Sequence, residues 1–171
     1  MAKIKKRREN MKAIINLKNP TKEQVEKIIE HFVAYDIDDF ILYVTYPQYI
    51  IDGKDLLYYI TNGIKITCVN DNGKESTAIK LINLKGSLEE PFFVVYSSDA
   101  CQIELDSLIL SHKEQGSTAT IGIANEKMVT VLFEPQVFDY ISEEMSLEKD
   151  VLERIGQDLD LNVYKSEEIT A

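Results

Sequence analysis

Tryptophan is absent from this 171-residue chain, and cysteine occurs only at Cys68 and Cys101. Two cysteines without a secretory-type start predict reduced thiols in a cytoplasmic protein rather than a disulfide framework. No apolar run approaches the roughly 20 residues that span a bilayer, so we expect neither a signal peptide nor a membrane segment. With 44% hydrophobic and 28% charged residues, the composition is that of a folded domain.

Positive charge is scarce outside the first ten residues. The formal net charge is −10. Residues 1–10 hold five Lys or Arg against Glu9, a charge of +4, so residues 11–171 carry −14. A body this acidic repels phosphate backbones and anionic lipids, and we expect no nucleic-acid or membrane binding. We interpret residues 1–10 as a basic flexible tail, with an electrostatic arm as the alternative, and residues 11–171 as a single domain.

Short apolar runs alternate with amphipathic segments along the chain. The runs predict strands at 12–16, 40–46, 64–69, 92–96, 118–123 and 128–133, and an edge strand at 161–164. Helices are predicted from Thr21, at 49–61, 77–84 and 105–114, from Pro135, and at 146–155. Buried strands that alternate with helices indicate the α/β class: three α/β/α layers around a mostly parallel, Rossmann-like sheet. The ligand crevice of such a sheet lies beyond the carboxyl ends of its strands.

Several collinear segments over most of residues 11–164 resemble the sugar-1-phosphate nucleotidyltransferases, which join a nucleoside triphosphate to a sugar phosphate. The clearest is Glu90-Pro91-Phe92-Phe93-Val94-Val95, which leads to Asp99. The other segments are 11–15, 28–41, 105–121, 133–141 and 146–150. The resemblance implies a minimal version of the nucleotide-diphospho-sugar transferase-like fold.

Glycine is missing where the resemblance most requires it. The family's first loop is long and glycine-rich, because backbone without Cβ can wrap N–H donors around a triphosphate. Here the link is Asn16-Leu17-Lys18-Asn19-Pro20-Thr21, which holds none of the seven glycines, and Pro20 has no N–H donor. A connector this short cannot enclose a triphosphate. We therefore predict a catalytically inactive protein with no catalytic residues.

Asp99 matches the family's metal-binding aspartate, although Ser97-Ser98 precede it where the family has glycine. The resemblance implies residual Mg²⁺ contact at Asp99, but such a site usually needs another carboxylate. The family's second aspartate lies beyond residue 164 in one alignment and corresponds to Asn162, a poorer ligand, in another.

Glu148 and Asp150 match an acidic pair that approaches the sugar in the family, while Ser146 to Lys149 alone is typical of a helix cap. The candidate ligand-binding residues are therefore Ser97, Ser98, Asp99, Glu148 and Asp150. Lys127 lies in a tight predicted hairpin that replaces a long excursion of the family, and we interpret it as a turn lysine. No histidine has zinc-ligand spacing.

The preferred hypothesis is an inactive nucleotidyltransferase-like domain that acts as a binding or assembly module in sugar-nucleotide or cell-envelope metabolism. A protein partner is expected, either a second copy or an active transferase. Two alternatives stay open: a minimal transferase active only with a partner subunit, and a nucleotide or sugar sensor. No cofactor is expected, apart from Mg²⁺ if activity remains.

Overall fold

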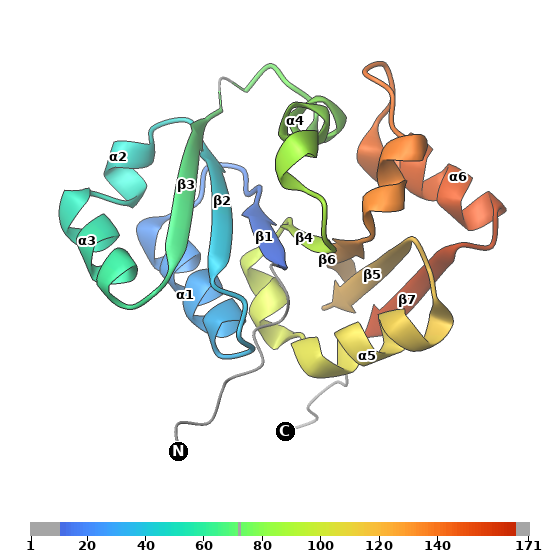
Figure 1. Cartoon of the computed structure of the whole chain (residues 1–171), viewed down its shortest axis with the longest axis horizontal. Coiled ribbons are helices and arrows are strands. Elements are labelled where there is room, and N and C mark those ends of the chain that lie inside the picture. Colours follow the sequence, from blue (N-terminus) through green and yellow to red (C-terminus); the bar gives the residue numbers. More distant parts are fainter. Residues whose placement is uncertain (1–10, 72, 167–171) are drawn as a thin grey trace.

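One mixed β-sheet of seven strands forms the centre of residues 11–71 and 73–166, which this computed structural model describes (Figure 1). The strands are β1 (Lys12–Ile15), β2 (Asp39–Val44), β3 (Lys65–Asn70), β4 (Phe92–Val95), β5 (Ala119–Ala124), β6 (Lys127–Phe133) and β7 (Leu161–Lys165). Their spatial order is β3-β2-β1-β4-β6-β5-β7. Only β6 is antiparallel to its neighbours among the described strands. The sheet is mostly parallel, as predicted, and β7 is the predicted edge strand.

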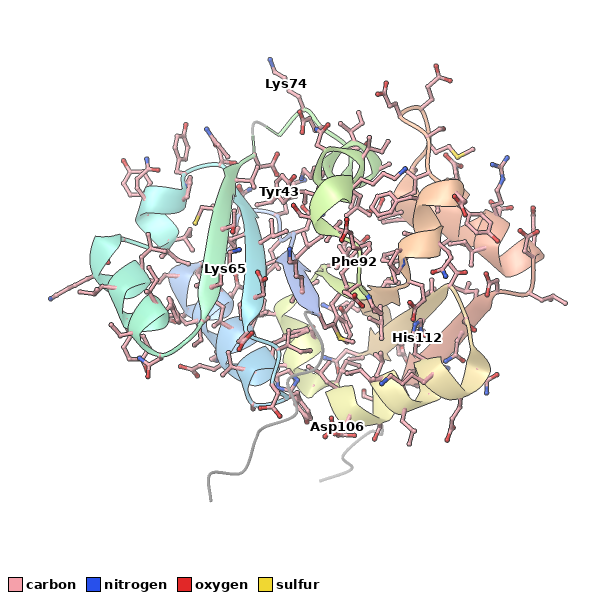
Figure 2. All side chains as sticks on the ribbon, in the orientation of Figure 1. Tyr43, Lys65, Lys74, Phe92, Asp106 and His112 are labelled. Atoms are coloured by element: carbon pink, nitrogen blue, oxygen red, sulfur yellow. The ribbon has the colours of Figure 1, made fainter. Side chains whose placement is uncertain are left out.

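Helices cover both faces of the sheet, which confirms the three-layer α/β/α prediction (Figure 1). They are α1 (Lys22–Val33), α2 (Pro47–Ile50), α3 (Gly53–Thr61), α4 (Thr77–Leu84), α5 (Leu105–Gln115) and α6 (Leu152–Gln157). The core under α1 and α5 includes Phe32 and Phe93, whose ring centroids are 5.3 Å apart. The core under α4 and α6 includes Leu81 and Phe92, which is labelled in Figure 2. Phe92 and Phe93 pack into the cores on opposite faces of the sheet, because successive side chains of a strand point to opposite faces.

The stretch 49–61, predicted as one helix, forms two helices. Ile51 is extended, with φ −132° and ψ 111°. Asp52, the next residue, is the N-cap of α3 and forms a reciprocal capping box with Asp55. Asp55 N–H donates to Asp52 Oδ1 (2.9 Å), and Asp52 N–H donates to Asp55 Oδ2 (3.1 Å). The prediction was wrong there because the side chain of Asp52 satisfies a new helix start, which apolar periodicity alone does not reveal.

The other helix predictions hold in outline. Thr21, where a helix start was predicted, caps α1 through a capping box with Gln24. The stretch 77–84, predicted as a helix, is α4. The predicted helix at 146–155 begins as a π-helical turn, Leu147–Val151, before α6, and the short helix from Pro135 is a 3-10 helix, Pro135–Asp139. A further 3-10 turn, Lys85–Ser87, follows α4.

The strand order reverses at β1, which lies between β2 and β4. Such a switch point opens a crevice at the carboxyl ends of the strands. Two segments border it: the connector 16–21 after β1 and the 3-10 turn Ser98–Gln102 after β4. Asn16 N–H donates to Val95 O (3.0 Å), so β1 and β4 remain paired up to this edge. Within the described residues, no helix has the length and apolar character needed to cross a bilayer.

Candidate functional site

An acidic side chain that follows the carboxyl end of β4 directly contacts a basic side chain at the start of β6. Ser97 Oγ accepts a hydrogen bond from Asp99 N–H (3.1 Å), which fixes the turn after the strand. Asp99 Oδ2 lies 2.7 Å from Lys127 Nζ, and the two side chains are 30% and 54% exposed. The hydrogen bond from Lys127, which outweighs the effect of burial, lowers the pKa of Asp99. Lys127 lies at the end of the predicted hairpin, but it reaches across to Asp99 and is more than a turn lysine.

Mg²⁺ is the metal that the resemblance found in the sequence implies at Asp99. It binds through carboxylates and substrate phosphates in near-octahedral geometry. Among the described residues, no group of three or more His, Cys, Asp or Glu side chains could hold a metal ion. Asp99 has an ammonium group as its partner instead. The side chains around Asp99 therefore do not form a Mg²⁺ ligand set, and metal contact at this residue stays a prediction.

Glu148 and Asp150 lie on the π-helical turn before α6, where both contact Ser146. Asp150 Oδ2 accepts from Ser146 N–H (2.9 Å), and Ser146 Oγ accepts from Lys149 N–H (3.3 Å). This is a capping arrangement, which was the structural interpretation of the motif. Ser146 Oγ also lies 3.5 Å from Glu148 Oε2.

Glu148 also approaches the end of β4. Burial, and secondarily the nearby Glu148 carboxylate, hold the pKa of Tyr96 well above its ordinary value. The buried Tyr96 hydroxyl has no partner in hydrogen-bond geometry among the described residues. Tyr96 immediately precedes Ser97. The structure therefore brings one member of the acidic pair, Glu148, close to the Tyr96 hydroxyl, while Asp150 is used as a cap.

A polar cluster that the sequence analysis missed lies between the ends of β1 and β3 and helix α4. Lys80 is only 7% exposed, and its Nζ donates to Asn16 Oδ1 (3.0 Å) and Asp71 Oδ2 (2.8 Å). Asn16 Nδ2 donates to Thr77 Oγ1 (3.2 Å). The ammonium also lies 5.1 Å from the ring centroid of Tyr43, which Figure 2 shows on β2. We call Asn16, Asp71, Thr77 and Lys80 the Lys80 cluster.

The Lys80 cluster is electrostatically balanced within itself. Burial would raise the pKa of Asp71, but hydrogen bonds from Lys80 and from Gly73 N–H outweigh it and lower that pKa. The partners of Lys80 are 64 and 9 positions away, so no local motif in the sequence marks them. One signal was available: a lysine in the apolar stretch 77–84 must find a partner when the helix packs on a sheet.

A pocket of about 350 Å³ lies beside this cluster, above the ends of β1, β2 and β3. The connector residues Leu17 to Pro20 form one wall, and Tyr46 and Tyr49 form another. Lys18 and Asp71 contribute charges of opposite sign to its lining. The volume is at the lower end of the range for small-molecule sites. The arrangement suits a small ligand with an apolar body rather than an extended triphosphate.

The two histidines and Asn162 have structural partners. His112 is buried between Thr120 Oγ1 (2.6 Å) and Glu134 Oε1 (2.9 Å), and His31 Nε2 lies 2.8 Å from Ile103 O. Asn162 donates to Ser111 and Thr120 near the start of β7, away from the carboxyl edge that carries Asp99. None of these contacts places a histidine or Asn162 at the crevice.

No protein family model matches the sequence, and no curated protein matches it. Solved structures do match the fold. A structure described as a glucose-1-phosphate thymidylyltransferase from Bacillus anthracis, in complex with sucrose, matches with a TM-score of 0.60 and 14% identity over 92% of this chain and 87% of that one. HddC from Yersinia pseudotuberculosis matches with a TM-score of 0.61 and 14% identity over 90% and 89% of the two chains.

A third match is a CMP:2-keto-3-deoxy-manno-octonic acid synthetase structure with CTP, with a TM-score of 0.55 and 8% identity over 91% of this chain and 88% of that one. All three pairs share most of their length and little sequence. The resemblance drawn from the sequence segments is thus confirmed at the level of three-dimensional structure. The chain has the fold of the sugar nucleotidyltransferases.

Proposed function

We propose that this chain is a catalytically inactive nucleotidyltransferase-like domain that acts as a binding or assembly module linked to sugar-nucleotide metabolism. The connector between β1 and α1 carries the proposal. Asn16 N–H is bonded to Val95 O, Pro20 has no N–H, and Thr21 N–H is bonded to Gln24 Oε1. Leu17, Lys18 and Asn19 alone remain as backbone donors in the connector. They are too few to surround a triphosphate, which requires a concave set of N–H groups.

The two ends of the crevice support the same interpretation. The side chain of Asn16 is held by Lys80 and Thr77, and the carboxylate of Asp99 is held by Lys127. Polar groups that could meet phosphate or metal are thus bonded within the protein. Positions that a transferase would keep available for its substrates are used here to connect secondary-structure elements.

The assembly role is supported by apolar exposure around α2 and α3. The exposed large side chains of this region are Tyr46, Tyr49, Leu57, Tyr58 and Ile60, all at least 62% exposed. Aromatic residues of this kind are enriched at protein interfaces. Light scattering after size-exclusion chromatography, alone and with a candidate transferase, distinguishes a second copy from an active enzyme as the partner.

A turnover assay tests the inactivity directly. The purified chain is incubated with Mg²⁺, each nucleoside triphosphate and a panel of sugar 1-phosphates, and nucleotide-sugar and pyrophosphate are measured by chromatography. We expect no product above a protein-free control. Nucleotide-sugar formation that Asp99→Ala abolishes would overturn the proposal. Activity that appears only when a second protein is added would favour the minimal transferase with a partner subunit.

The pocket beside the Lys80 cluster favours ligand sensing as a second candidate function. Thermal-shift screening with nucleosides, nucleotides and sugar phosphates is the test, since a ligand at 100 times its Kd stabilises a protein by about 2.7 kcal/mol. A hit should be weakened by Tyr49→Ala in the pocket wall. The matched control is Tyr58→Ala, which is exposed on α3 and does not line this pocket.

A further inference from the structure

A groove of about 560 Å³ runs between α1 and α3. Figure 1 shows these two helices on the face of the sheet opposite α4. Its apolar lining comprises Ile29, Val33, Tyr59 and Ile64. Ile29 and Tyr59 are buried, and Val33 and Ile64 are half-buried. The groove is separate from the crevice at the carboxyl edge, because Ile64 precedes β3 and Val33 ends α1. It reaches the amino edge of the sheet at Val33 and Ile64, while Glu26 and Asp55 line it nearer the starts of α1 and α3.

Carboxylates border this apolar lining. Glu26, Glu30 and Asp55 all line the groove. Asp55 is paired with Lys22 at 2.9 Å, but neither Glu26 nor Glu30 forms an ion pair with another described residue. Burial and the carboxylates of Glu26, Asp55 and Glu30 raise the pKa of Tyr59 to about 12, which reflects the negative potential in the groove. The groove therefore combines an apolar lining with two carboxylates, Glu26 and Glu30, that form no ion pair within the described part of the chain.

The start of the chain carries the complementary chemistry. Residues 3–8 read Lys-Ile-Lys-Lys-Arg-Arg, with five positive charges and one branched apolar side chain. Residues 1–10 lie outside the part that the structure describes, and the chain enters the described part at Met11.

The strand register places the entry point near the groove. Lys12 pairs with Asp39 in β2, and Asp39 pairs with Lys65 in β3, the residue after Ile64. Met11 is therefore two strand spacings, about 10 Å, from the groove end of β3 along the same edge. Ten extended residues span up to about 33 Å, so residues 3–8 are long enough to reach the groove of their own chain.

We propose that residues 3–8 bind in the groove between α1 and α3 of the same chain, with Ile4 against the apolar side chains and the Lys and Arg groups facing Glu26 and Glu30. A basic segment gains from both features: the apolar side chain loses water contact, and the ammonium and guanidinium groups meet carboxylates that form no ion pair with any residue of 11–71 or 73–166. The inference goes beyond the proposed function, because it assigns an occupant to a surface remote from the crevice.

Amide NMR spectra of the full chain test this. The wild type is compared with a full-length variant in which Lys3, Lys5, Lys6, Arg7 and Arg8 are all changed to Gln. We expect amide shift differences at Glu30, Ala34, Asn62 and Ile64, and none in β5 to β7. Raising NaCl from about 0.01 M to about 1 M shortens the Debye length from about 30 Å to about 3 Å. The wild-type groove signals should then move toward those of the variant.

Matched charge variants complete the experiment. Glu26→Gln/Glu30→Gln should abolish the salt response at Ala34, Asn62 and Ile64. Glu143→Gln/Glu144→Gln, an exposed acidic pair before the π-helical turn, should leave it intact. Differences confined to residues outside the groove would overturn the proposal. Groove shifts that depend on protein concentration would also overturn it, because they would mean that the segment binds a second copy.

Discussion

Lys127 Nζ and Asp99 Oδ2 form a 2.7 Å ion pair that joins the β5–β6 turn to the carboxyl end of β4. The hydrogen bond from Lys127 lowers the pKa of Asp99. We therefore expect Lys127→Met to raise that pKa toward its ordinary value of 3.8. Carboxyl ¹³C NMR titration measures this, with Lys149→Met on the π-helical turn as the control. An unchanged Asp99 pKa in Lys127→Met would contradict the pairing.

The same variant bears on metal binding. If Asp99 retains the residual Mg²⁺ contact implied by the family, Lys127→Met removes the competing ammonium group, and Mg²⁺ titration should shift the Asp99 carboxyl signal in the variant more than in the wild type. Equal, negligible shifts in both proteins would indicate that Asp99 has lost this role.

Lys80→Met should destabilise the fold, since it leaves Asp71 and Asn16 without their cationic donor. We expect a loss of about 2 kcal/mol, below the about 3–5 kcal/mol of fully buried pairs, because the Asp71 side chain is 17% exposed. Asp71→Asn should lower the free energy of unfolding by less in the Lys80→Met background than in the wild type. Urea denaturation of the four proteins gives the coupling energy, and additive losses would argue against a coupled pair.

Asp71 also predicts an acid dependence of stability. Its pKa is lowered in the folded state, so its contribution is present above the unfolded value of about 3.9 and is lost as pH falls through the folded pKa. The stability gap between the wild type and Asp71→Asn should therefore be constant near neutral pH and shrink below about pH 4. A stability difference between the two proteins that grows as the pH falls would contradict this prediction.

Gly122 and Gly156 offer a matched pair for testing the packing of the sheet. A Cβ at Gly122 would lie 2.9 Å from Thr130 Cγ2 and 3.0 Å from Leu108 Cδ1, both on buried side chains. Gly122→Ala should therefore cost about 1–3 kcal/mol through overpacking. A Cβ at Gly156 in α6 meets Leu161 Cδ2 at an ordinary 3.5 Å. Gly156→Ala should stabilise by about 0.5–1 kcal/mol through helix propensity, as urea denaturation would show.

Tyr59 should be among the last tyrosines to ionise, with a pKa of about 12. Because this value is raised above the ordinary 10.0, its contribution to stability is full below pH 10 and is lost as pH rises toward 12. Tyrosine ¹³Cζ NMR titration measures the pKa, and Tyr59→Phe assigns the signal. Glu26→Gln/Glu30→Gln should lower this pKa, whereas Glu143→Gln/Glu144→Gln should not.

Much of the fold was predictable because its strands are marked locally. The runs around Phe40 and Phe92 are apolar on both faces, as strands buried between helix layers must be. Glu134-Pro135 and Thr21 with Gln24 likewise mark where turns and helices begin. The break at Asp52 was missed because a cap can interrupt an amphipathic stretch without disturbing its periodicity.

The candidate site was harder to predict because its contacts are not local. The Ser97–Asp99 turn follows directly from the end of a strand, so its position was accessible from sequence. Lys127 and Lys80 find their partners only through strand order: β6 reverses direction beside β4, and α4 returns over the ends of β1 and β3. Neither relationship has a sequence spacing that identifies it.

The β5–β6 turn has a consequence for how chains of this fold can diversify. Asn125 and Glu126 both have positive φ (52° and 62°), the geometry of the tightest hairpin connection. Because β6 runs antiparallel to β4, this tip is directed to the crevice edge, while the rest of both strands is held in register. Inserted residues there would overhang the crevice and leave every strand pairing unchanged. The length of any segment that covers the crevice edge is thus set at a single hairpin tip, independently of the stability of the sheet beneath it.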